Sequence, residues 1–170
     1  VALVARAFLF FGYPSRMTGD TIWLSTQSIF NLGYTLPDGY TMATPLGQIA
    51  QGIPVNASMN DMIIGLIPGS VGETSVIAIE LGALLLIWTN IASWKTMLSV
   101  FVGGAFMSYI FQTTGASPIT WYEHFVLGGF CFGAVFMATD PVTSARTETG
   151  KWIYGFIIGV LAVIIRVLNL

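Results

Sequence analysis

The sequence predicts an all-α, polytopic transmembrane helical bundle in which some helices are short or broken. Two features of its composition indicate this fold class: 55% of the 170 residues are hydrophobic and only 8% are charged. Soluble domains carry about 25% charged residues. A chain with so few charges could not keep a water-facing surface in solution, so lipid must cover much of it. The third feature is that the charges fall mainly in turns between long apolar runs.

Four apolar runs occupy the second part of the chain, at 75–93, 96–112, 121–138 and 152–168. A helix needs about 20 apolar residues to cross a bilayer, and the runs approach that length. We therefore expect 75–168 to form a frame of four transmembrane helices. Aromatic residues, which favour the membrane–water interface, flank the runs at Trp94, Trp121, Tyr122, Trp152 and Tyr154.

The first part of the chain is interrupted by proline and glycine, and its apolar stretches at 21–32 and 59–67 are too short to cross a bilayer. Non-helical backbone at membrane depth survives only where protein buries it or a cavity hydrates it. Short, broken apolar segments are also typical of binding sites in transporter-like folds. We therefore interpret 13–74 as an irregular half that holds the functional loop. The whole chain, 1–170, is expected to be one membrane-domain fragment of a larger inverted-repeat-type fold.

The few basic residues predict the orientation of the chain. Lys95 lies between the first two apolar runs, and Arg146 and Lys151 lie between the last two, so these turns share one face. Short cytoplasmic loops carry an excess of Lys and Arg. That face is therefore expected to be cytoplasmic, and the turn around Thr44 is expected on the outer face.

Composition also excludes several kinds of site. A net charge of −2 leaves no basic stripe for nucleic acid. Cys131 is the single cysteine, which excludes a disulfide framework or a cysteine metal site within this chain. His124 is the single histidine and is a poor candidate for a metal ligand. We assign no catalytic residue and no metal site.

The densest polar run is 36–47. Asp38 and Gly39 form a dipeptide typical of tight turns, and the hydroxyls of Thr41 and Thr44 follow it. On composition alone, this run also fits an ordinary surface turn between apolar segments.

A second polar run, 68–75, places Ser70, Glu73 and Thr74 at the start of an apolar run. Its glycines would let backbone N–H groups point at a phosphate, and a helix N-terminus would add partial positive charge. Glu73 would repel an anion unless its carboxylate caps the helix or is hydrogen-bonded elsewhere.

Four stretches resemble, in the same order, signatures of one membrane protein family. Thr41-Met42-Ala43-Thr44 is similar to a flavinylation motif that usually reads Ser-Gly-Ala-Thr, with Met42 in place of glycine. The family is that of NqrB, a membrane subunit of the sodium-translocating NADH:quinone oxidoreductase, and its relative RnfD of the RNF complex. The ends of the chain's last run, at 149–152 and 165–169, look more like the sodium pump subunit. The other similar stretches are 11–20, 69–75 and 138–142.

The resemblance implies that Thr44 is esterified to the phosphate of FMN, with Thr41 as the alternative hydroxyl. It also implies that the cofactor is held by residues of the two polar runs around Thr44. These residues are Asp38, Gly39, Thr41, Ala43, Ser70, Glu73 and Thr74.

The resemblance further implies a multi-pass redox subunit in the bacterial inner (cytoplasmic) membrane. Electrons would pass from covalent FMN through riboflavin to quinone, coupled to Na⁺ export, within a complex of several subunits. Two alternatives remain: the flavin-carrying subunit of the related RNF ferredoxin:NAD complex, and a flavin-free membrane transporter or channel of similar fold.

Charged residues at the ends of the apolar runs allow more than one interpretation. Ionisable groups within a membrane are costly and usually face protein or water. Glu80 and Asp140 are candidates for a cation path, although interfacial anchoring also explains Glu80. Anchoring or a carboxylate at a helix start explains Glu123, and Arg166 fits a snorkelling or paired residue.

Small residues predict close helix packing. We expect such contacts at Gly103 and Gly104, at Gly128 and Gly129, and at Gly155 and Gly159.

Overall fold

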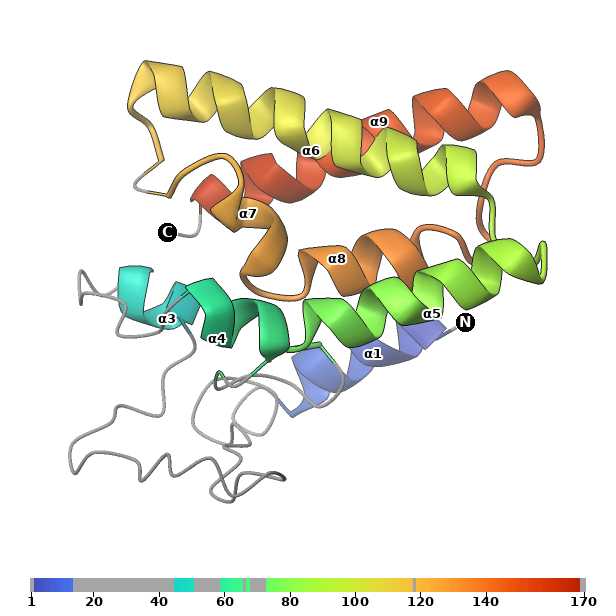
Figure 1. Cartoon of the computed structure of the whole chain (residues 1–170), viewed down its shortest axis with the longest axis horizontal. Coiled ribbons are helices and arrows are strands. Elements are labelled where there is room, and N and C mark those ends of the chain that lie inside the picture. Colours follow the sequence, from blue (N-terminus) through green and yellow to red (C-terminus); the bar gives the residue numbers. More distant parts are fainter. Residues whose placement is uncertain are drawn as a thin grey trace.

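The computed structural model describes residues 2–13, 45–50, 59–65, 67, 73–117 and 119–168. Every regular element in these ranges is helical, which confirms the all-α class (Figure 1). In chain order the elements are α1 (Ala2–Gly12), α3 (Pro45–Ala50), α4 (Met59–Ile64), α5 (Val76–Trp88), α6 (Trp94–Thr114), α7 (Glu123–Val126), α8 (Phe130–Phe132), the π-helix η2 (Gly133–Met137) and α9 (Glu148–Leu168).

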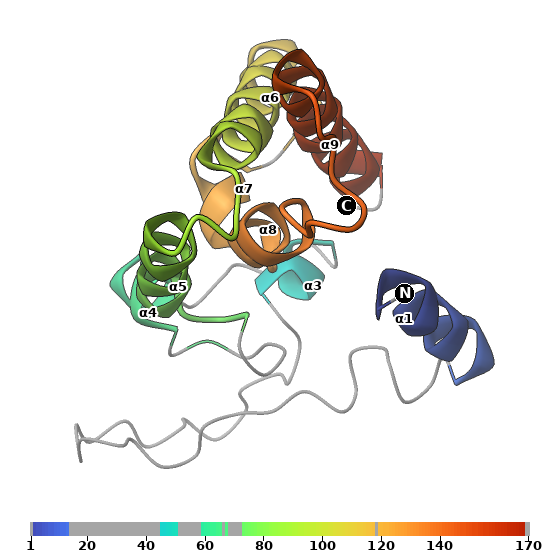
Figure 2. The same cartoon turned by 90° about the vertical axis from the view of Figure 1, so that its right-hand side faces the viewer.

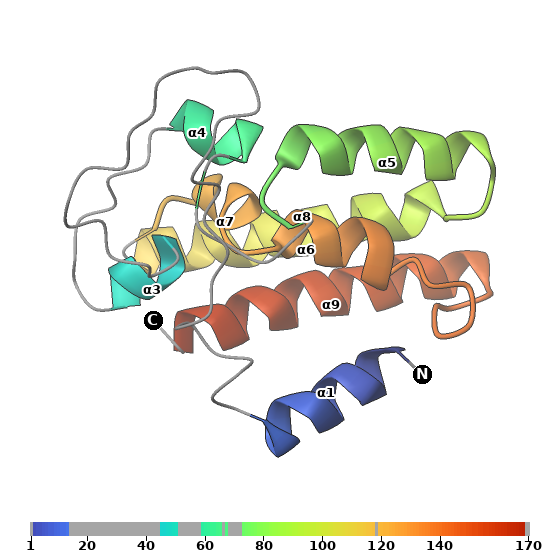
Figure 3. The same cartoon turned by 90° about the horizontal axis from the view of Figure 1, so that it is seen from below.

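Helices α6 and α9 lie side by side along their length (Figures 1 and 3). Each has 21 residues, and they are the two described helices long and apolar enough to cross a membrane. At about 1.5 Å per residue, such a helix matches the roughly 30 Å hydrocarbon core. The first turn of α6 meets the first turn of α9 through Lys95 and Glu148, and Gly103 meets Gly159 further along. The two helices are therefore parallel.

The absence of side chains at three glycines brings α6 and α9 together. A Cβ atom at Gly159 would lie 2.1 Å from the carbonyl oxygen of Val100, and one at Gly103 would lie 2.3 Å from that of Phe156. A Cβ atom at Gly155 would lie 2.7 Å from the carbonyl oxygen of Thr96. These distances confirm the close packing predicted for Gly103, Gly155 and Gly159.

The first apolar run is helical over a shorter stretch than expected. α5 has 13 residues, begins where Ser75 accepts a hydrogen bond from the Ala78 amide, and ends at Trp88 instead of continuing to 93. Asn90, just beyond it, has a left-handed φ of 56°, which an α-helix does not tolerate. The helix therefore stops before the run of apolar residues does.

The structure corrects the expectation of one continuous helix over 121–138. The run divides into α7 and a second helical piece formed by α8 and η2. Between them, Leu127 is extended and Gly128 and Gly129 have φ values of 62° and 65°. Glycine adopts this left-handed region without the steric penalty of a Cβ atom. The glycine pair therefore creates a break in the backbone, which we call the Gly128–Gly129 break.

The second helical piece lies below the α6–α9 pair and beside α5 (Figure 2). Its side chains fill two apolar clusters. Cys131 and Val135 pack with Ile79 of α5 and Met97 of α6. A second cluster, formed by Val100, Phe130, Ala134, Ala138 and Val163, joins it to α6 and α9.

The glycine contacts between α6 and α9 make a prediction about stability. In Gly159→Ala, the added methyl group has no room, so we expect a loss of about 1–3 kcal/mol, the usual cost of overpacking. Thermal unfolding of the full-length protein in detergent measures this loss.

Gly133→Ala is the matched control, because its backbone is helical and nothing lies within 4 Å of the added atom. It should be neutral, or stabilising by about 0.5–1 kcal/mol. Equal unfolding temperatures for Gly159→Ala and the wild type would contradict the close packing.

Candidate functional site

The Gly128–Gly129 break leaves backbone carbonyl groups without helical partners, and two side chains, Arg166 and Cys131, donate hydrogen bonds to them. The Arg166 guanidinium of α9 donates to the carbonyl of His124 and, at 3.0 Å, to that of Gly128. The Cys131 thiol donates to the carbonyl of Phe125 at 3.1 Å. Buried backbone groups are costly when unpaired, above all where no water reaches them. These side chains therefore make the break possible.

Arg166 is held by more than these two hydrogen bonds. Its guanidinium carbon lies 5.8 Å from the centre of the Phe130 ring, within range of a cation–π contact. The side chain is partly buried. The interpretation of Arg166 as a paired residue is thus confirmed, and its partners are backbone carbonyls.

Two segments from the irregular half contact the break. A Cβ atom added to Gly128 would lie 2.1 Å from Leu46 Cδ1. A Cβ atom added to Gly129 would lie 2.8 Å from Glu73 Oε2. Leu46 also packs beside a buried cluster of Met62, Ile119 and Leu127. Leu46 of α3 and Glu73, which lies just before α5, therefore meet at the same pair of glycines.

The polar residues around the start of α7 form a local hydrogen-bonded group. Glu123 Oε2 accepts a hydrogen bond from the Thr120 amide at 2.9 Å, as a carboxylate at a helix start does. His124 is fully buried, and its Nε2 lies 3.2 Å from the Ser117 hydroxyl. These contacts support the structural interpretation of Glu123 and give His124 a position in the core.

An apolar cavity of about 430 Å³ adjoins the break. Its walls come from α6, α9 and the α8–η2 piece, and include Gly128, Gly129 and Arg166. Small-molecule sites are usually clefts of about 300–1,000 Å³ with mostly apolar walls and a few polar groups. The cavity thus has the size and composition of a small-molecule site.

The predicted site residues divide into those the structure describes and those it does not. Glu73 and Thr74 are described, and Glu73 lies at the break. Glu80 lies on an exposed position of α5. Asp140 accepts hydrogen bonds from the Val142 amide at 3.2 Å and the Thr143 hydroxyl at 3.1 Å. The residues outside the described ranges are Asp38, Gly39, Thr41, Ala43, Thr44 and Ser70.

Sequence reasoning did not assign a site role to Arg166 or to the glycine pair. The available signals were a cation inside an apolar run and two consecutive glycines in the middle of another. Neither signal indicates that the two features meet.

The hydrogen bonds of Arg166 predict that its removal destabilises the protein. In Arg166→Gln the carbonyls of His124 and Gly128 lose a charged donor, so we expect a loss of about 2–4 kcal/mol in thermal unfolding. Arg166→Lys should lose less stability than Arg166→Gln, because it keeps the positive charge. It should still be less stable than the wild type, because lysine lacks the planar fork that reaches two carbonyls.

Arg146→Gln is the control, since it removes the same charge from an exposed loop position. A stability of Arg166→Gln equal to that of this control would show that the guanidinium does not support the break.

Comparison with known proteins places the chain in a family. The model of the NQR2, RnfD, RnfE family matches residues 1–170. Three relatives named as a subunit of Na⁺-translocating NADH-quinone reductase are 47% identical (Chromohalobacter salexigens), 45% identical (Pseudoalteromonas atlantica) and 44% identical (Stutzerimonas stutzeri). Each alignment covers 99% of this chain and 40–41% of the relative, so the chain spans about two fifths of their length. Since the family model matches every residue, the chain belongs to the NQR2, RnfD, RnfE family.

Proposed function

We propose that the chain is part of the membrane subunit of a Na⁺-translocating NADH:quinone oxidoreductase and carries FMN on Thr44. The match of the family model to all 170 residues, together with relatives named as a subunit of this enzyme, is the observation that carries the proposal. In this proposal, electrons pass from FMN through riboflavin to quinone, and the transfer is coupled to Na⁺ export. The protein works in the bacterial inner membrane with the other subunits of the complex.

The covalent attachment has a physical rationale. The Thr44 hydroxyl oxygen forms a phosphoester with FMN, and one water is lost relative to the free molecules. A tether gives the flavin a permanently high local concentration, so the protein does not need a deep pocket to retain it. The flavin supplies the redox chemistry, while the protein supplies its position and electrostatic surroundings.

Two described residues that lie close to Thr44 or within the second polar run in the sequence meet at the break. Leu46, two residues after Thr44 in the sequence, lies against Gly128, and Glu73 lies against Gly129. One oxygen of the Glu73 carboxylate therefore lies beside the backbone of the break. The hydroxyl of Thr74 and the turn at Asp38 and Gly39 belong to the same proposed site.

The remaining proposed roles rest on the resemblance to the family. Ser70, Thr41 and Ala43 would shape the cofactor site, and Glu80 and Asp140 would line a cation path. Asp140 already accepts two hydrogen bonds in its turn, one on each carboxylate oxygen. Glu80, on an exposed face of α5, is the more accessible carboxylate.

The second candidate is the flavin-carrying subunit of the RNF ferredoxin:NAD complex. The family model includes both groups, so its match does not distinguish them. The relatives at 43–47% identity that are named as a subunit of the Na⁺-translocating reductase favour the first candidate.

Thr44 gives the proposal a direct test. Thr44→Ala should abolish flavin fluorescence on a denaturing gel, because it removes the acceptor oxygen. Mass spectrometry of the wild-type peptide that contains Thr44 should show an added mass of FMN less one water.

Thr44→Ser retains a hydroxyl and should keep some of the adduct, and Thr41→Ala should keep all of it. Fluorescence that persists in Thr44→Ala and disappears in Thr41→Ala would move the attachment to Thr41. Absence of fluorescence from the wild-type protein would favour a flavin-free transporter or channel.

A further inference from the structure

A polar cavity of about 490 Å³ lies where α6 and α9 begin, at the opposite end of α9 from Arg166. Asn90, Ser93, Thr139 and Ser144 contribute amide or hydroxyl groups to its walls. Three basic residues, Lys95, Arg146 and Lys151, also line it, and Glu148 is the single acid among the described lining residues.

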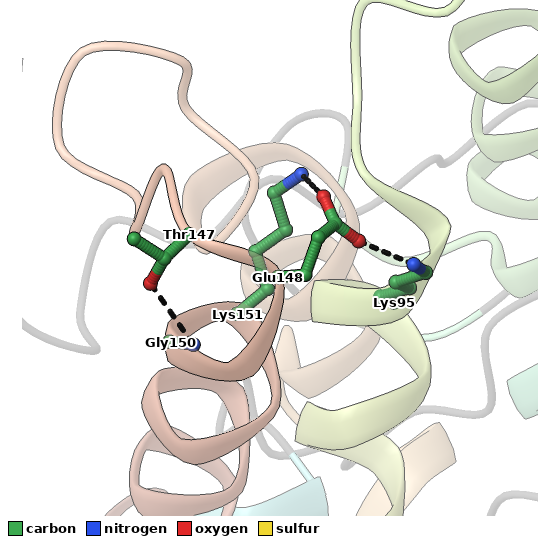
Figure 4. A network of polar contacts seen from close by, with 5 residues as sticks. All are labelled: Lys95, Thr147, Glu148, Gly150 and Lys151. Carbon is green, nitrogen blue, oxygen red and sulfur yellow. Dashed lines mark hydrogen bonds and ion pairs between the residues drawn. The ribbon is translucent and has the colours of Figure 1, made fainter.

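The basic residues leave the cavity positively charged. Glu148 bridges both lysines: its Oε1 lies 2.7 Å from Lys151 Nζ, and its Oε2 contacts Lys95 Nζ (Figure 4). One carboxylate neutralises only one of these cations, and Arg146 adds another. An anion that entered the cavity would therefore meet an excess of positive charge.

The helix backbones add to this charge. Because α6 and α9 are parallel, both of their N-termini lie at the cavity, and each carries a partial charge of about +0.5. Ser93, at the N-cap of α6, makes no side-chain capping hydrogen bond. At the start of α9, the Thr147 hydroxyl accepts a hydrogen bond from the Gly150 amide at 3.1 Å.

Aromatic side chains place the cavity at the level of lipid headgroups. Trp94 and Trp152 pack edge to face with their ring centres 6.3 Å apart, and Lys95 Nζ lies 5.8 Å from the Trp94 ring centre. Tryptophan and lysine at the ends of spans favour the membrane–water interface. One turn further along α6, Leu98 is 47% exposed, and beside Trp152 on α9, Ile153 is 57% exposed.

We propose that this cavity binds the phosphate of an anionic phospholipid headgroup, with the acyl chains against the exposed apolar residues of α6 and α9. Basic pockets between transmembrane helices at the cytoplasmic side favour anionic lipids. The positive-inside rule assigns this end of α6 and α9 to that side. A phospholipid fits better than free phosphate, because apolar side chains continue from the cavity along both helices. The proposal depends on a membrane location and is independent of flavin attachment.

Native mass spectrometry of the full-length protein tests the proposal. The protein, purified in neutral detergent, is titrated with phosphatidylglycerol and with phosphatidylcholine of the same acyl chains. Phosphatidylglycerol should bind more tightly. Each basic residue near the membrane surface contributes roughly five-fold in affinity, so the Arg146→Gln, Lys151→Gln double variant should bind phosphatidylglycerol on the order of 25-fold more weakly.

Two further variants separate this effect from misfolding and from net charge. Gln112→Glu makes the chain more negative by one charge, half the change in the double variant, at the far end of α6, and it should bind as the wild type does. Glu148→Gln removes the competing carboxylate and should bind phosphatidylglycerol several-fold more tightly. A gain of binding cannot result from a failure to fold.

Three outcomes would overturn the proposal. The first is equal binding of the two lipids by the wild type. The second is unchanged phosphatidylglycerol binding in both the double variant and Glu148→Gln. The third is displacement of phosphatidylglycerol by inorganic phosphate at equal concentration, which would identify free phosphate as the ligand.

Discussion

The pairing of the Arg166 guanidinium with the carbonyls of His124 and Gly128 is the interaction on which the irregular part of the structure depends. A helix interrupted within an apolar environment must find new partners for the carbonyls it exposes, or it does not form. Arg166 supplies several donors on one planar group, so one side chain can reach two carbonyls. The cost of placing an arginine in an apolar helix is thus offset by backbone groups that would otherwise be unpaired.

The Gly128–Gly129 break in turn determines where the segments of the irregular half can pack. Leu46 and Glu73 approach the two glycines so closely that a Cβ atom on either glycine would overlap them. Helices α6 and α9 support the break from the other side, through Val100 and Val163, which lie in one apolar cluster with Phe130. The break therefore connects the continuous helices with the segments that flank the proposed flavin loop.

Much of the helical frame could be predicted, because hydrophobic composition and length determine whether a helix can cross a bilayer. The runs 96–112 and 152–168 fall within α6 and α9. The glycines at 103, 155 and 159 predicted close helix packing, and the structure shows that this packing joins these two helices. The break could not be predicted in the same way, since hydropathy measures transfer from water and not backbone conformation. The partner of Gly128 is 38 residues away, a pairing that no local pattern records. For the site, the structure brings Glu73 to the break, whereas Thr44 lies outside the described residues, so its role stays a prediction.

The separation between Gly128 and Arg166 also has a consequence for how the protein is made. During synthesis, the carbonyls of His124 and Gly128 leave the ribosome ahead of Arg166, which follows them in the sequence. Until the last turn of α9 is in place, α7 and α8 lack the donor that pairs those carbonyls. The interrupted segment therefore cannot complete its fold as it leaves the ribosome, and its final conformation must wait for the insertion of the helix that follows it.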